Sequence, residues 1–176
     1  MRLRRRVSVS LLPLLLIFLT LVPPANSQDV ESVAVAAKPS VAVILVQRAD
    51  GVVSGTAFMA AERLVLTAEH VVANARRIVV KFPDYPAVDA KLYGSDSEND
   101  VAVLAIPGLP VRPLPLGDVS QVREGQRVVV VGFPRIEVLG AEAATVTEGI
   151  VSDVRPGLIQ MQAPVNPGSS GGPVLS

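Results

Sequence analysis

The chain has 176 residues, with 16 basic and 16 acidic side chains, one histidine and no cysteine, and 49 % of its residues are hydrophobic. The missing cysteines and the single histidine exclude zinc fingers, cysteine-bound clusters and disulfide-stapled small domains. Zero formal net charge without a long basic run argues against a nucleic-acid-binding protein, and the apolar content excludes a disordered chain.

The N-terminus has the pattern of a secretory signal peptide. Residues 1–6 carry four arginines, residues 7–22 form an apolar run, and the small-residue segment 23–27 follows, with cleavage expected after Ser27. A retained membrane anchor is the alternative, but the run is shorter than the roughly 20 residues of a membrane span and Pro13 interrupts it. Cleavage leaves 12 basic and 16 acidic side chains, a net charge of −4 over 149 residues. We therefore expect a mildly acidic, secreted or periplasmic protein that is stabilised by packing alone.

Short segments rich in Val and Ile follow a linker expected at residues 28–38. Turn residues such as Asp50-Gly51 and Pro83-Asp84 separate them, and only residues 68–74 have a helical pattern. The predicted strands of this first half are residues 40–47, 52–59, 63–67, 77–82, 88–93 and 101–106.

A connector rich in Pro and Gly at residues 107–117 leads to a second set of strands. With so little helix, the pattern predicts an all-β chain of two barrels or sandwiches, the N-terminal one over residues 39–108 and the C-terminal one over 109–176. The predicted strands of the second half are residues 127–133, 144–154, 158–163 and 173–175.

Three side chains supply the parts of a nucleophilic catalytic site. His70 lies where a predicted strand ends, Asp100 directly precedes an apolar strand, and Ser170 lies in the segment N-P-G-S-S-G-G-P. They provide a base, an acid to orient it and a nucleophile. Each alone has an ordinary alternative: a solvated histidine, a turn aspartate of the kind expected at Asp96, or a flexible Ser-Gly loop. Their joint occurrence at strand edges, in the order His, Asp, Ser, favours the catalytic interpretation.

The glycines around Ser170 suggest an oxyanion hole. A tight turn can point several backbone N–H groups at one spot, where they stabilise the negative oxygen of a tetrahedral intermediate by about 3 kcal/mol per donor. We expect this hole to be built from the backbone of residues 168–170, with the N–H groups of Gly168 and Ser170 as donors and Ser169 shaping the turn between them.

Six blocks of the sequence resemble the HtrA (Deg) branch of the chymotrypsin-fold serine proteases, over about residues 33–176. The resemblance implies two six-stranded antiparallel barrels with the active site in the cleft between them. It also implies Ser170 as nucleophile, His70 as base, Asp100 as the residue that orients it, no metal or cofactor, polypeptide substrates, and an oligomer such as the trimer common among relatives. The blocks are residues 55–58 (G-T-A-F), 66–72 (L-T-A-E-H-V-V), 96–104, 129–134, 147–152 and 160–174.

The sequence departs from the family pattern in two places. Ser169 stands where the family has Asn or Asp, and the chain stops at Ser176, six residues past Ser170. Related domains continue for two further strands, and many add a PDZ domain, so we expect an incomplete second barrel and a chain that is a fragment or a truncated gene product. In chymotrypsin-like folds the residue six before the nucleophile lies at the base of the P1 pocket. Here Pro164, beside Ala163, predicts an uncharged, aliphatic P1 preference.

These features predict a secreted serine endopeptidase of the HtrA type, with a role in protein quality control. A protease-fold binding or chaperone-like module without turnover is the alternative, which the missing strands make plausible. A non-enzymatic secreted β-barrel domain is a third, and the order of the triad argues against it.

Overall fold

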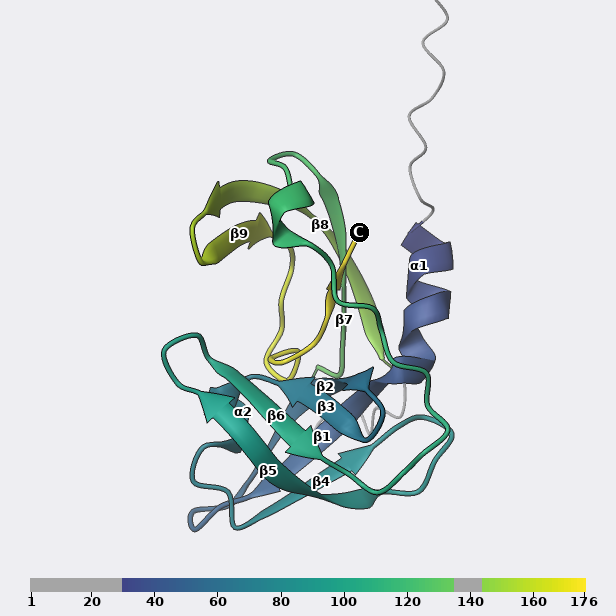
Figure 1. The fold of residues 1–176 in the computed structure, drawn as a ribbon, viewed down its shortest axis with the longest axis vertical. Coiled ribbons are helices and arrows are strands. Elements are labelled where there is room, and N and C mark those ends of the chain that lie inside the picture. Colours follow the sequence, from purple (N-terminus) through teal and green to yellow (C-terminus); the bar gives the residue numbers. More distant parts are fainter. Residues whose placement is uncertain (1–29, 135–143) are drawn as a thin grey trace, which may run out of the picture.

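The computed structural model describes residues 30–134 and 144–176, and the predicted signal peptide lies outside them. The described chain forms a closed barrel, a second sheet above it and a helix, α1 (Val30–Ala37), alongside (Figure 1). No helix of this described part is long and apolar enough to cross a membrane.

The first six strands close into an antiparallel barrel in the order β1-β2-β3-β6-β5-β4. Alternating burial follows from the two-residue period of a strand: Ile78 and Val80 point inward from β4, and Ala102 and Leu104 from β6. All six strands predicted for the first half are confirmed, with shifts of a few residues at their ends. Their bounds are β1 Val41–Gln47, β2 Val52–Ala61, β3 Leu64–Thr67, β4 Arg77–Lys81, β5 Val88–Asp96 and β6 Val101–Ala105.

The second unit is a four-stranded antiparallel sheet in the order β10-β7-β8-β9. Unlike the first six strands, these four do not close on themselves, and an apolar hollow of about 210 Å³ lies between Val128, Val151 and Met161. The predicted architecture, a complete first barrel and an incomplete second one, is therefore confirmed. The bounds are β7 Arg127–Gly132, β8 Thr145–Arg155, β9 Leu158–Gln162 and β10 Val174–Leu175.

Strand β1 contributes to two apolar clusters at once. Its residues Ala42 and Ile44 are buried inside the barrel, whereas Val41 and Val43 pack in a second cluster with Val131 and other side chains of the second unit. Both faces of β1 are therefore covered over its first four residues, where its sequence is a continuous apolar run rather than an alternating one.

Helix α1 occupies the segment that the sequence analysis treats as a linker. Its residues Val30, Val33, Ala34 and Ala37 recur at helical spacing, and Ala34 and Ala37 are buried. The single helix expected at residues 68–74 is shorter in the structure, α2 (Glu69–Val72).

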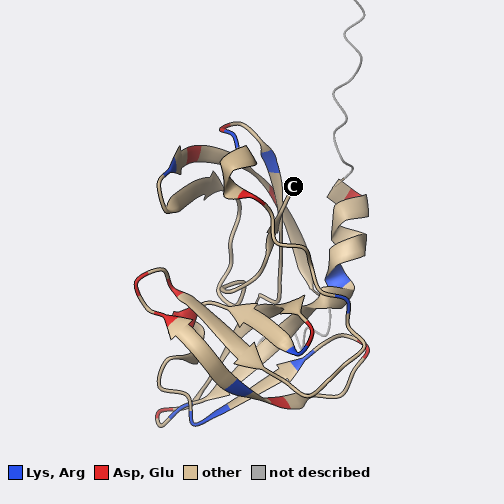
Figure 2. Ribbon diagram, viewed as in Figure 1, with Lys and Arg blue, Asp and Glu red and all other residues tan. Residues whose placement is uncertain are grey.

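The connector 107–117 contains no strand, as expected, but it lies on the barrel. Val111 is buried, the Leu114 N–H donates to the Met59 carbonyl at 2.8 Å, and the Ser40 hydroxyl donates to the Arg112 carbonyl at 2.6 Å. A short 3-10 turn, Val119–Gln121, follows it. Charged residues lie mainly at turns and strand ends, with acidic ones gathered at the turn between β5 and β6 (Figure 2).

Candidate active site

Strand pairing brings His70 and Asp100 together. Strands β3 and β6 are antiparallel with Thr67 opposite Ala102, so the residues just after β3 face the residues just before β6. His70 is the second residue of α2, which follows β3, and Asp100 immediately precedes β6. A backbone bond from the Glu69 N–H to the Asp100 carbonyl, 3.2 Å long, extends the pairing by one step.

The Asp100 carboxylate holds His70 at two points. Its Oδ1 accepts the backbone N–H of His70 at 2.8 Å, and its Oδ2 lies 2.7 Å from the imidazole Nδ1. An ionised carboxylate only accepts hydrogen bonds, so Nδ1 carries the proton and Nε2 keeps its lone pair. The imidazole therefore has the tautomer that a general base needs.

The backbone and the pKa of Asp100 both reflect this contact. Its φ of +54° lies in the left-handed region, which Asp tolerates better than most residues. Partial burial works to raise the pKa of the Asp100 carboxyl. The hydrogen bonds from the His70 amide and ring and from the Glu69 amide, with the attraction of the ring, outweigh it and hold the pKa below its ordinary value. The carboxylate is thus kept ionised at neutral pH.

Asp96 is a turn residue, as the sequence analysis expects. Its Oδ1 accepts the N–H groups of Glu98 and Asn99 at 3.0 and 3.1 Å, and its Oδ2 accepts the Asn99 side chain at 2.7 Å. These bonds shape the loop between β5 and β6 that ends at Asp100.

Arg48 binds the backbone carbonyls of α2, a contact that was not predicted from the sequence. Its guanidinium donates to the backbone carbonyls of His70 and Val71, at 2.6 and 3.1 Å. A cation at the carbonyl end of a helix satisfies groups that have no partner within the helix. The contact joins residues 22 positions apart, and no sequence motif links Arg48 to α2. The one available signal was the position of Arg48 directly after β1.

Two consecutive turns form the loop that carries Ser170. In the first, Pro167 and Gly168 are the central residues and the Ser169 N–H donates to the Asn166 carbonyl at 3.0 Å. Gly168 has φ +97°, as the third position of a type II turn requires. In the second, the Gly172 N–H donates to the Ser169 carbonyl at 3.0 Å, with Gly171 at φ +83°. Ser170 lies at the second position of this second turn.

These turns bear on the predicted oxyanion hole. The Ser169 N–H is bonded to the Asn166 carbonyl inside the first turn, in keeping with the turn-shaping role expected of Ser169. No carbonyl in residues 30–134 and 144–176 accepts the N–H of Gly168 or of Ser170. Two of the three residues therefore keep a backbone donor that a substrate oxygen could use.

The Ser170 loop lies against the end of β3, close to His70 in the chain. The Thr56 N–H of β2 donates to the Ser170 carbonyl at 2.8 Å. A methyl group added at Gly171 would overlap Thr67 Oγ1 and lie 2.7 Å from the Ala68 nitrogen. The backbone after the nucleophile thus lies against Ala68, which is two positions before His70 in the chain. Only glycine fits at position 171. Within the described residues, the Ser170 hydroxyl makes no hydrogen bond of its own.

The residues predicted at the base of the P1 pocket, Ala163 and Pro164, follow β9. Ala163 is half-buried against Gly149 of β8, where an added methyl group would lie 2.6 Å from its Cβ, and Pro164 is exposed. Neither residue lines the hollow beside α2 or the one between Val128, Val151 and Met161. Their role in specificity stays a prediction.

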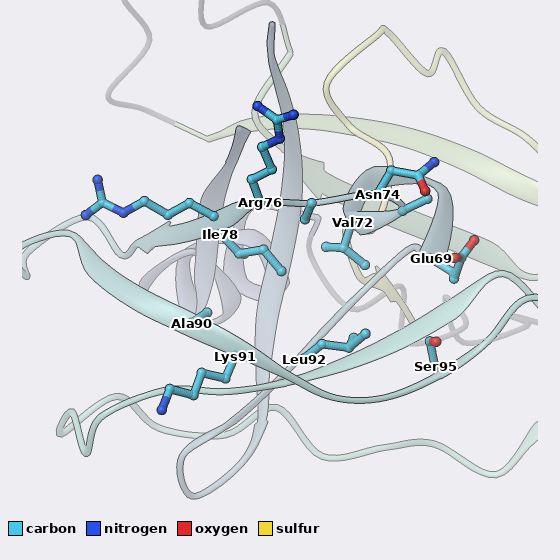
Figure 3. Close-up of a pocket in the computed structure, with 12 residues that line it drawn as sticks. Glu69, Val72, Asn74, Arg76, Ile78, Ala90, Lys91, Leu92 and Ser95 are labelled. Atoms are coloured by element: carbon cyan, nitrogen blue, oxygen red, sulfur yellow. The ribbon is translucent and has the colours of Figure 1, made fainter. Parts of the chain in front are cut away.

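A hollow of about 400 Å³ lies beside α2 (Figure 3). Glu69, Val72 and Asn74 come from α2 and the turn after it, and Leu92 comes from β5. None of the three predicted catalytic residues lines this hollow, but Glu69, whose N–H bonds to the Asp100 carbonyl, does. In the part of the chain that the structure describes, no three His, Asp or Glu side chains group as metal ligands would.

Comparison with known sequences gives one consistent family. A model of the trypsin-like peptidase domain matches residues 53–176. The chain is 39 % identical over 131 residues to a probable periplasmic serine endoprotease, DegP-like, of Pseudomonas fluorescens, a match that covers 69 % of the chain and 26 % of the relative. It is 37 % identical over 127 residues to the serine protease Do-like HtrB of Bacillus subtilis, covering 64 % and 27 %. The chain spans about a quarter of the length of these curated relatives.

Solved structures agree with the architecture. The HtrA-type protease AlgW, determined with a tripeptide, superimposes with a TM-score of 0.73 at 32 % identity, over 83 % of this chain and 50 % of that one. The serine endoprotease from Yersinia pestis gives a TM-score of 0.72 at 28 % identity, over 83 % and 53 %.

Proposed function

Because this chain belongs to the trypsin-like peptidase family and is of the HtrA type, we propose that it hydrolyses peptide bonds as a serine endopeptidase. Ser170 would be the nucleophile, His70 the general base and acid, and Asp100 the residue that orients the imidazole. The backbone N–H groups of Gly168 and Ser170 would form the oxyanion hole.

The reaction proceeds in two halves. The Ser170 Oγ attacks the scissile carbonyl while its proton passes to His70 Nε2, and the carbonyl oxygen becomes an oxyanion that the two N–H groups stabilise. The C–N bond breaks as His70 returns the proton to the leaving amine, which leaves an acyl-enzyme. Water then attacks the ester with His70 again as base, and Ser170 recovers its proton when the acid product leaves.

The observation that carries this proposal is the two-point contact between Asp100 and His70. The bonds of 2.8 Å to the backbone N–H and 2.7 Å to Nδ1 fix both the position of the ring and its tautomer. A structural ion pair would need only the second bond. The paired N–H and ring contacts favour a catalytic role, since they leave Nε2 as the only free basic nitrogen of the chain's one imidazole.

The substrates would be polypeptides, with aliphatic P1 residues such as Val, Ala or Leu. Neither Ala163 nor Pro164 carries a charge that would pair with Lys or Arg. The predicted signal peptide and the periplasmic naming of the Pseudomonas relative support action outside the cytoplasm. The protein would act there in protein quality control, as a homo-oligomer such as a trimer.

A fluorophosphonate probe tests the proposal, because it bonds covalently to an activated serine. We expect labelling of the full-length protein that is lost in Ser170→Ala and kept in the matched variant Ser169→Ala. Peptidase activity on an unfolded protein substrate should follow the same pattern. Unlabelled protein that still binds unfolded polypeptide would instead favour a binding module without turnover. Labelling of Ser169 would mean that the register of the turn is wrong.

A further inference from the structure

Thr56 of β2 is a polar residue that is fully buried, and its hydroxyl joins two distant parts of the chain. Its Oγ1 lies 2.7 Å from the Gly168 carbonyl and 2.9 Å from the backbone nitrogen of Phe133, the residue after β7. A carbonyl only accepts and an N–H only donates, so the hydroxyl gives its proton to Gly168 and accepts from Phe133. Both bonds of the hydroxyl are therefore fixed in direction.

The backbone of Thr56 makes two more bonds around the candidate site. Its N–H donates to the Ser170 carbonyl at 2.8 Å, and its carbonyl accepts the Thr67 hydroxyl at 2.7 Å. Thr67 is the last residue of β3, three positions before His70. One residue thus contacts the Ser170 loop twice and, through Thr67, the strand that leads to His70.

These contacts fix the peptide planes on both sides of the nucleophile. The plane between Gly168 and Ser169 is held at both ends, since its oxygen bonds to Thr56 and its N–H bonds to Asn166. The plane that follows Ser170 is held through its oxygen by the Thr56 N–H. The Gly168 N–H belongs to the preceding plane, between Pro167 and Gly168, which is the central plane of the first turn. A turn held at the Gly168 carbonyl and at the Ser169 N–H, with Gly168 at positive φ, therefore also sets the direction of the Gly168 N–H.

We propose that Thr56 is a positioning residue, whose hydroxyl holds the Ser170 loop in the conformation that aims the Gly168 N–H at the substrate oxygen. This inference rests on the function proposed above. Removing the hydroxyl leaves the part-buried Gly168 carbonyl and the buried Phe133 N–H without a partner. The first turn then loses its anchor, and its central Pro167–Gly168 plane can rotate. The oxyanion donor would then turn away, while Ser170, His70 and the substrate-binding residues stay in place.

The test compares Thr56→Val, which keeps the shape and removes the hydroxyl, with Thr56→Ser, which keeps the hydroxyl. In the full-length protein we expect Thr56→Val to lower kcat by about tenfold to a hundredfold, the range that a misplaced group can cost. KM should change less than twofold, and Thr56→Ser should recover kcat to within about threefold. Ser40→Ala is the control, because the buried Ser40 hydroxyl also donates to a backbone carbonyl, that of Arg112, and not to the Ser170 loop.

Amide hydrogen exchange measures the stability of the two turns of the Ser170 loop and does not depend on peptidase activity. The N–H groups of Ser169 and Gly172 close the two turns, and in Thr56→Val both should exchange at least tenfold faster, whereas amides of β4 should not change. If Thr56→Val does not fold, Thr56→Cys against Thr56→Ser makes the same comparison with a weak donor. Unchanged exchange in the loop, or a Thr56→Ser variant as impaired as Thr56→Val, overturns the inference. Faster exchange in a protein that no fluorophosphonate labels would leave Thr56 as a positioning residue and refute the proposed peptidase instead.

Discussion

The exchange of Asp100 for Asn tests the proposed tautomer with almost no change of shape. The Asn oxygen can still accept the backbone N–H of His70, as Asp100 Oδ1 does at 2.8 Å. The amide NH₂ must then face Nδ1, where the second carboxylate oxygen lies 2.7 Å away. An NH₂ only donates, so Nδ1 has to become the acceptor and the ring proton moves to Nε2. Nε2 is the nitrogen that must take the proton of Ser170.

The structure sets the size of this effect. Loss of the correct tautomer in a buried triad lowers kcat by about 10⁴-fold. Here the His70 and Asp100 side chains are 57 % and 49 % exposed, so water can compete for Nδ1 and part of the population can keep the productive tautomer. We therefore expect a loss of about 10³-fold near neutral pH, which corresponds to about 4 kcal/mol in the activation free energy. Folding stability should change by only about 1 kcal/mol, because one accepting bond remains.

The assay is steady-state hydrolysis of a peptide substrate by the full-length protein between pH 6 and 9. Asp118→Asn is the matched control, since the Asp118 carboxylate accepts the Ser120 N–H of its own turn and bonds neither to His70 nor to the loop between β5 and β6. It should keep kcat/KM within about twofold of the wild type. An Asp100→Asn protein with more than a tenth of the wild-type kcat would refute the reasoning, because His70 would then act without the carboxylate.

Two further substitutions and one pH series also test the site. Gly171→Ala should lower the free energy of unfolding by more than about 2 kcal/mol in a urea titration, because the added methyl group would meet the Ala68 nitrogen at a positive φ; a neutral effect would mean that the loop can move away from β3. Arg48→Met keeps the apolar stem but loses both bonds to α2, and should lower kcat/KM by about threefold to tenfold; an unchanged value would show that α2 holds His70 unaided. Because the folded-state pKa of Asp100 is lowered, its bonds stabilise the fold above the pKa of unfolded aspartate, about 4, and this contribution is lost as the pH falls through the folded value. Urea unfolding from pH 2 to 6 should show a smaller acid loss in Asp100→Asn, and equal curves would contradict it.

The strands could be predicted because each carries its signal locally. Alternating or continuous Val and Ile runs between turn residues locate strands such as Arg77–Lys81 and Arg127–Gly132. Helix α1 could not be predicted in this way. Its sequence, V-E-S-V-A-V-A-A, is short and rich in valine, and it lacks the length for a stable helix on its own. Packing of Ala34 against the second unit supplies that stability, and packing is not a local property.

The residues of the candidate site could be predicted from local motifs, but their long-range contacts could not. His70, Asp100 and Ser170 stand in local motifs, so the sequence is enough to single them out. The partners of Thr56 lie 77 and 112 positions away in the chain, and the engagement of the Ser169 N–H depends on how the turn closes. Contacts of this kind arise only when the barrel and the second sheet have come together.

The burial of β1 on both faces has a consequence for how the molecule comes apart. Val41 and Val43 cover side chains of the second unit, and Ala42 and Ile44, alternating with them, fill the barrel. A shift of the β1 register by one residue would turn each of these side chains to the opposite face of the strand and disrupt both clusters. Melting of the barrel would remove Val41 and Val43 from the second cluster as well, so we expect heat or denaturant to unfold the two units in a single transition. A protease that attacks only opened chains would then meet either the whole intact molecule or an entirely unfolded one, with no surviving barrel as a fragment.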